Sequence, residues 1–81
     1  MEETFMDLQD FLVKFADLFN EKDAASINAN TKFKELEEWS SLIALSVIAM
    51  IEDEYSIAIK GNDIRNSDTV ENLFNAVKAY K

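Results

Sequence analysis

Hydrophobic residues recur every three or four positions near the beginning of the chain, and charged or polar residues separate them. The stripe consists of Phe5, Leu8, Leu12, Phe15 and Phe19, and Phe11 and Leu18 widen it. This spacing follows the turn of an α-helix, about 3.6 residues, and is typical of a helix that is apolar on one side. The pattern therefore predicts an amphipathic helix from about Thr4 to Phe19.

The periodicity fades over residues 20–40, a long polar connection that carries four large apolar residues, Ile27, Phe33, Leu36 and Trp39. A connection of this length is uncommon in a small domain and is often functional. We expect its apolar side chains to hold it across the core. We interpret Trp39 mainly as a core or loop-anchoring residue, although an aromatic side chain at this place can also bind a ligand.

The most hydrophobic segment of the chain comes next and predicts a second helix from about Ser41 to Glu54. Beyond it, the sequence SIAIKGND predicts a short extended piece and then a turn at Gly61, where the absence of a side chain permits a positive φ. The residues that follow predict one helical turn that is buried through Ile64.

A last helix is predicted to begin at Asp68 as its N-cap, with Glu71 completing a capping box. Its inner face would consist of Val70, Leu73, Phe74, Val77 and Tyr80. Three main helices, a short helix in third place and a long first loop predict an all-α fold, a small four-helix bundle. A chain of 81 residues is expected to form one domain, residues 1–81.

The composition removes several classes of function. The chain has no cysteine and no histidine, so it lacks a thiol nucleophile, the commonest general base and the commonest metal ligand. Its formal net charge of −8 has the wrong sign for a nucleic-acid binder. The amino terminus is acidic where a signal peptide is basic, and the run Leu42–Ile51 is roughly half a membrane span. We expect a cytoplasmic monomer without enzymatic activity that binds basic partners.

The second predicted helix has two sides of different character when its residues are placed about 100° apart. The side expected to face the core comprises Ala44, Val47, Ile48 and Ile51, flanked by Ile43 and Met50. The other side comprises Leu42, Leu45, Ser46, Ala49, Glu52 and Asp53. We interpret this second group as a docking face, because it is too apolar to be fully solvated and too acidic to be buried. The acids at the helix end point in different directions, which favours a solvated end over a metal site.

Two serines, Ser40 and Ser41, precede this helix. On spacing alone, a serine in front of an apolar run is ordinarily an N-cap. Ser40 can fill that role by itself, and Ser41 would then be the first helical residue with its hydroxyl free. Free backbone N–H groups and the positive end of the helix dipole favour a phosphate ester at such a position. Ser41 therefore suits the attachment of an anionic group.

The stretch FKELEEWSSLIALSVIAMIEDEYSIAI, followed by SDTVENLFNAV, resembles the acyl carrier protein family. In that family an Asp-Ser-Leu motif opens the second helix. The matching residues are Ser41 and Leu42 for the motif, Tyr55 for a following aromatic, Ile57 and Ile59 for an extended piece, and Thr69 and Val70 for the start of the last helix. The resemblance runs without a gap from about Phe33 to Val77, which is more than half of the chain.

This resemblance implies that Ser41 carries 4′-phosphopantetheine, whose thiol holds an acyl group as a thioester. It implies two kinds of partner, a phosphopantetheinyl transferase and acyl-processing enzymes with basic docking surfaces. Fatty acid, polyketide and lipid or surface-polysaccharide pathways use such carriers. Acyl chains could shelter between the helices, with Ile48 and Ile51 as candidate lining.

The sequence departs from the family pattern at three positions. Ser40 replaces the usual aspartate, Ser46 stands at an often acidic position, and Ser56 stands where a glycine often follows the aromatic. None of these changes removes the nucleophilic hydroxyl of Ser41. The alternative that stays open is an unmodified acidic helical domain that binds proteins, since its docking face would not need Ser41.

Overall fold

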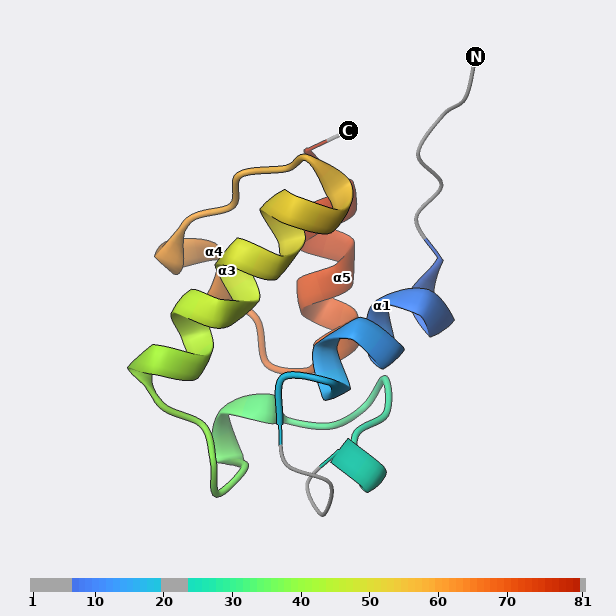
Figure 1. Cartoon of the computed structure of the whole chain (residues 1–81), viewed down its shortest axis with the longest axis vertical. Coiled ribbons are helices and arrows are strands. Elements are labelled where there is room, and N and C mark those ends of the chain that lie inside the picture. The colour runs from blue at the N-terminus through green and yellow to red at the C-terminus, as the bar shows by residue number, and fades with distance from the viewer. Residues whose placement is uncertain (1–6, 20–23, 81) are drawn as a thin grey trace.

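The computed structural model describes residues 7–19 and 24–80. Its elements are α1 (Leu8–Ala16), a 3₁₀ turn η1 (Phe33–Glu35), α3 (Ser41–Tyr55), α4 (Gly61–Arg65) and α5 (Val70–Lys78). Helix α1 packs against α3 and α5, and the short α4 packs against the same two helices (Figure 1). The described residues form no strand. The predicted all-α fold, a small helical bundle with a short helix before the last one and a long first loop, is confirmed.

Helix α1 is shorter than the predicted helix. It begins at Leu8, after Asp7, whose side chain accepts the Asp10 N–H at 3.2 Å as an N-cap. It ends at Ala16, and the next residues turn, with the Phe19 N–H bonded to the Ala16 carbonyl. The part of the prediction from Thr4 to Met6, with Phe5, lies outside the described residues. The carboxyl-terminal bound was wrong because hydrophobic periodicity continues through a turn that also faces the core.

The interior of the bundle is one cluster of aromatic and aliphatic side chains. Phe11 is completely buried, whereas Leu8 and Leu12 are only partly buried, so Phe11 lies at the centre of the apolar side of α1 and not at its margin. Its ring lies 5.4 Å from that of Phe74 on α5, measured between centroids. The apolar stripe was predicted correctly, but its centre depends on where α3 and α5 cover it.

The long first loop is held to the bundle as predicted. Phe33 is completely buried, and Ile27, Leu36 and Trp39 are partly buried against the core. Two backbone carbonyls of the loop, at Ala29 and Thr31, accept the N–H groups of Glu71 and Val70 at 3.0 and 3.1 Å. The loop thus satisfies donors that the first turn of α5 would otherwise leave without partners.

The start of α5 differs from the prediction by one residue. Thr69, not Asp68, is the N-cap, and its Oγ accepts the Asn72 N–H at 3.1 Å while the Asn72 side chain accepts the Thr69 N–H at 3.2 Å. Asn72 therefore completes the capping box in place of Glu71. The first four residues of the predicted inner face are buried, but Tyr80 is 48% exposed and its hydroxyl donates to Asp63. Tyr80 was wrongly assigned to the core, because it lies beyond the end of α5.

The positive φ predicted at Gly61 occurs instead at Ser56. Ser56 follows the last residue of α3 with φ 58° and ψ 36°, and its N–H donates to the Glu52 carbonyl at 2.9 Å. Gly61 has no positive φ and is the first residue of α4. The left-handed residue is needed where a helix ends, and glycine is the usual residue at that place.

We predict that Ser56→Gly will stabilise the protein, because glycine adopts the left-handed conformation without steric cost. Relief of the left-handed conformation is worth about 1–2 kcal/mol, and the greater freedom of glycine in the unfolded chain offsets part of it. The net gain in the free energy of unfolding should therefore be roughly 0.5–1 kcal/mol. Urea unfolding followed by circular dichroism measures it. Ser56→Ala is the matched control, which keeps the strain and loses only the hydroxyl. An equal gain from alanine would show that the backbone conformation at position 56 is not the cause.

Candidate functional site

The first turn of α3 gives the two adjacent serines different roles. Ser40 has an extended backbone, with φ −158° and ψ 173°, and its hydroxyl oxygen accepts the Ile43 N–H at 3.3 Å. Its carbonyl accepts the Ala44 N–H at 2.9 Å. Ser40 is therefore the N-cap, as predicted, and Ser41 is the first residue of the helix.

The Ser41 hydroxyl lies exposed at the amino-terminal end of α3. Among the described residues, none hydrogen-bonds to this hydroxyl or to the N–H groups of Ser41 and Leu42. These N–H groups point out of the positive end of the helix dipole, where an anion is stabilised. The local geometry therefore fits a phosphate ester on the Ser41 oxygen.

A groove of about 600 Å³ opens beside Ser41. Its lining comes from η1, the segment before α3, the first half of α3 and the short α4, and consists of Lys34, Trp39, Ser40, Ser41, Ala44, Leu45, Ile48, Gly61, Ile64 and Arg65. Apolar side chains form most of this surface, and two cations stand in it. Such a combination suits a ligand that is mostly apolar and carries an anion.

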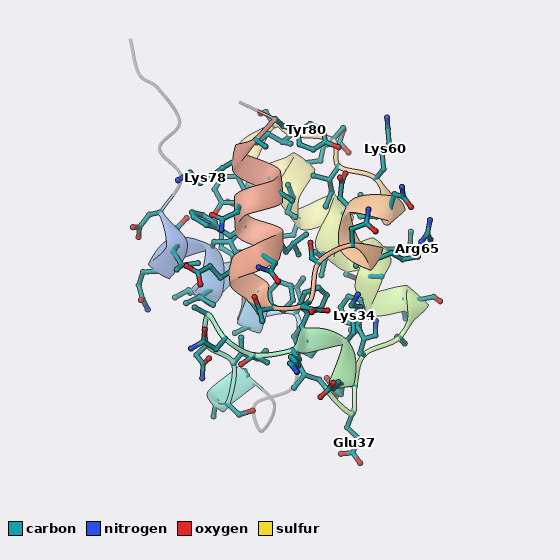
Figure 2. All side chains as sticks on the ribbon, turned by 180° about the vertical axis from the view of Figure 1, so that it is seen from behind. Lys34, Glu37, Lys60, Arg65, Lys78 and Tyr80 are labelled. Carbon is teal, nitrogen blue, oxygen red and sulfur yellow. The ribbon has the colours of Figure 1, made fainter. Side chains whose placement is uncertain are left out.

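The two cations of the groove are held by different elements. The Lys34 ammonium, on η1, donates to the Arg65 carbonyl oxygen at the end of α4 at 2.8 Å. The Arg65 guanidinium donates to the Asn62 side-chain oxygen, also at 2.8 Å. Figure 2 shows Lys34 and Arg65 near one another on one side of the molecule. The contact between Lys34 and Arg65 joins the long loop to α4 and closes that side of the groove.

Trp39 anchors the loop to the core, as predicted from the sequence. Its ring meets Phe33 at 5.0 Å in an edge-on arrangement and stacks on Phe19 at 6.5 Å, measured between centroids. It also lines the groove beside Ser41. Of the two residues named as candidate lining, Ile48 borders the groove, whereas Ile51 is completely buried in the core and does not.

The face of α3 predicted for docking lies mostly on the surface. Leu42 and Leu45 are 72% and 63% exposed, which is unusual for leucine side chains next to one another. Ala49, Glu52 and Asp53 are exposed as well, and Ser46 is partly buried. The Ser46 hydroxyl donates to the Leu42 carbonyl at 3.1 Å, so it is bonded back onto its own helix. The opposite face is directed inward, with Val47 and Ile51 completely buried.

A second hollow, of about 560 Å³, separates α1 from the docking face of α3. Residues of α1, of the turn that follows it and of α3 line it: Lys14, Asp17, Leu18, Ser46, Ala49, Met50, Asp53 and Glu54. It extends the acidic surface of α3 onto α1. The sequence could not reveal this extension, because residues of two separated helices contribute to it.

A small polar network lies beside this second hollow. The Lys14 ammonium bonds the Asp10 carboxylate at 2.6 Å and lies 3.8 Å from Glu54, and the Tyr55 hydroxyl donates to Asp10 at 2.9 Å. The hydrogen bonds from Lys14 and then from Tyr55 lower the pKa of Asp10. Burial, followed by the bond to Asp10, raises the pKa of Tyr55. The network joins α1 to the end of α3 and so fixes the two helices that line the hollow.

Sequence reasoning missed the residues that α4 and η1 bring to the groove, namely Lys34, Gly61, Ile64 and Arg65. No spacing along the chain relates Lys34 to Arg65. The only available signal was that both are basic in an acidic chain. Among the described residues there is no group of three or more side chains able to hold a metal ion. None of the described helices is long and apolar enough to cross a bilayer.

Comparison with known proteins gives a family match over most of the chain. The model of a family described as the phosphopantetheine attachment site matches residues 9–77, a range that includes both serines and the groove. No curated protein and no solved structure matches the chain.

We predict that the two serines contribute unequally to stability. Ser40→Ala removes the oxygen that accepts the Ile43 N–H and should lower the free energy of unfolding by about 1 kcal/mol. Ser41→Ala removes a hydroxyl without a partner in the described structure and should leave stability nearly unchanged. Urea unfolding of both variants at one pH and salt concentration compares them. Equal losses in the two variants would contradict the assignment of Ser40 as the cap.

Proposed function

The chain belongs to the phosphopantetheine attachment family, and from that membership we propose that it is an acyl carrier protein whose Ser41 bears the cofactor. The family is defined by 4′-phosphopantetheine attached covalently to a serine. One observation carries the choice of Ser41. Its hydroxyl is exposed and without a bond to any described residue at the start of α3, while the neighbouring Ser40 accepts the Ile43 N–H.

Attachment would proceed from coenzyme A with the help of a transferase. The Ser41 oxygen forms a bond to the phosphorus that carries the pantetheine, and the pyrophosphate bond breaks. Adenosine 3′,5′-bisphosphate leaves, and a base on the transferase takes the hydroxyl proton, because the chain has no histidine or cysteine of its own. The free N–H groups of the first turn of α3 favour the phosphodiester that results.

When bound, the arm supplies a thiol that holds an acyl group as a thioester. The residues of this chain then position the arm at the end of α3 and present it to other enzymes. The groove beside Ser41 offers Ala44, Ile48 and Ile64 as apolar surface for part of the cargo. In this proposal the protein is a carrier and a substrate of its partners, and it has no catalytic centre of its own.

The partners would be enzymes with a basic docking surface. The exposed leucines Leu42 and Leu45 lie at the Ser41 end of α3, and the acids Glu52 and Asp53 lie at the other end. Apolar contact would therefore occur next to the attachment point, while the acids steer a basic partner from a distance. Ser46 and Ala49 lie between the leucines and the acids, and because their side chains are small they would let a partner approach the helix closely.

The first test of the proposal is modification at a single oxygen. Wild-type protein incubated with coenzyme A and a promiscuous transferase should gain the mass of one phosphopantetheinyl group, and Ser41→Ala should gain nothing. Ser40→Ala should still be modified. Intact-mass spectrometry followed by peptide fragmentation measures the gain and its position. If wild type stays unmodified with several transferases, an unmodified protein-binding domain, whose docking face does not need Ser41, becomes the better account.

The second test concerns the acids of the docking face. Replacing Glu52 and Asp53 by lysine should weaken binding to a transferase, measured by titration calorimetry. Wild-type binding should weaken as salt rises, because exposed charges are screened beyond about 8 Å at physiological ionic strength.

The matched control replaces Glu37 and Glu71 by lysine, which changes the net charge equally at exposed positions outside α3. Circular dichroism of both variants checks that the fold is kept. Equal weakening by the two double variants would show that only the overall charge matters. If the variant with Glu52→Lys and Asp53→Lys binds as tightly as wild type, this face does not take part in the interaction.

A further inference from the structure

Two cations flank the groove beside Ser41 in a chain that is otherwise strongly acidic. The whole chain has sixteen acidic and eight basic residues. Both ion pairs found in the described part of the chain belong to Lys14, so neither Lys34 nor Arg65 lies within 4 Å of a described carboxylate. The groove is therefore lined by two cations that have no carboxylate partner in the described part of the chain.

Both cations are positioned and keep unused donors. The Lys34 side chain is partly buried and uses one of its three N–H donors on the Arg65 carbonyl. The Arg65 guanidinium uses one of its five donors on Asn62. A side-chain carbon placed at Gly61 would lie 3.9 Å from the guanidinium, so Arg65 extends close to the backbone of Gly61, which also lines the groove. The remaining donors are available to an anion.

We propose that Lys34 and Arg65 bind the phosphodiester of the arm on Ser41 and hold the arm against the groove beside Trp39. This inference rests on the proposed function. The phosphodiester is bonded directly to the Ser41 oxygen, so it must stay at the mouth of the groove that Ser41 lines. Lysine and arginine form charge-assisted hydrogen bonds with phosphate oxygens, and these bonds are shorter and stronger than neutral ones.

The charges around Ser41 favour a position of the phosphodiester next to the two cations. The end of α3 and the two cations attract the phosphodiester, whereas the acids Glu52 and Asp53 lie at the far end of α3. The apolar lining then receives the parts of the arm that follow. The arm would thus have a docked state that depends on salt, because these attractions are largely between exposed groups.

Two signals of the modified protein report on this state. The ³¹P chemical shift of the phosphodiester responds to the cations, and the fluorescence of Trp39, the only tryptophan, responds to occupancy of the groove. We expect attachment to reduce the quenching of Trp39 by acrylamide at low salt and this protection to be lost at high salt. We also expect the ³¹P shift to move with salt.

The decisive comparison uses modified variants. Lys34→Gln with Arg65→Gln should lose the protection of Trp39 and the salt dependence of the ³¹P shift. Arg65→Gln alone should lose part of the protection and part of the salt dependence. This single variant keeps the backbone carbonyl that accepts from Lys34, so it can be used if the double variant unfolds. The matched control is Lys60→Gln with Lys78→Gln, which changes the charge equally. Neither of these lysines lines the groove, and Figure 2 shows both apart from Lys34.

The outcomes separate this inference from the proposed function. If mass spectrometry finds the arm on Ser41 but the Lys34 and Arg65 variants behave like wild type and the control, the inference is overturned and the carrier function stands. Equal loss of signal in the control would also overturn it, because general charge and not the groove would be responsible. If Ser41 never receives the arm, both are overturned.

Discussion

The burial of the Phe33 ring is the contact on which the candidate functional site depends. Phe33 lies in the long loop, is completely buried, and packs edge-on against Phe15 of α1 at 5.5 Å and against Trp39 at 5.0 Å. Burying such a side chain contributes about 1.5–3 kcal/mol, and each ring pair adds about 0.5–1.5 kcal/mol. These contacts oppose the conformational freedom of the loop and fix the position of Trp39, the residue directly before Ser40. The position of Ser41, and one wall of the groove, follow from them.

Helix α4 supplies the other wall although it is only a short element, Gly61–Arg65. Ile64 anchors it in the core. The Asp63 carboxylate accepts the Lys60 N–H at 2.9 Å at the start of the helix, and it also accepts the Tyr80 hydroxyl from beyond the end of α5. The backbone N–H of Lys60, and next the hydroxyl of Tyr80, lower the pKa of Asp63. A helix too short to be stable alone is thereby held in place, which lets Gly61 and Arg65 face the groove.

Acidic and basic side chains lie beside opposite ends of α3. The docking face carries Glu52 and Asp53 farther along the helix, and the groove carries Lys34 and Arg65. A basic partner and an attached phosphodiester would therefore be drawn to different ends of α3. This separation would allow one small, acidic protein to attract partners and yet hold an anionic arm, because each attraction acts over a short range at physiological salt.

The sequence by itself determined the helical bundle, the start of α3 and its end to within one residue, and the separate roles of Ser40 and Ser41 as cap and free hydroxyl. These features are local, since periodicity and capping act within about one or two turns of a helix. Only the tertiary structure decided that Phe11 is central, that Ser56 takes the left-handed turn, and that Thr69 with Asn72 caps α5 where the loop carbonyls meet it. It alone brought Lys34 and Arg65 together, 31 residues apart, because the groove exists only once η1 and α4 meet beside the first half of α3.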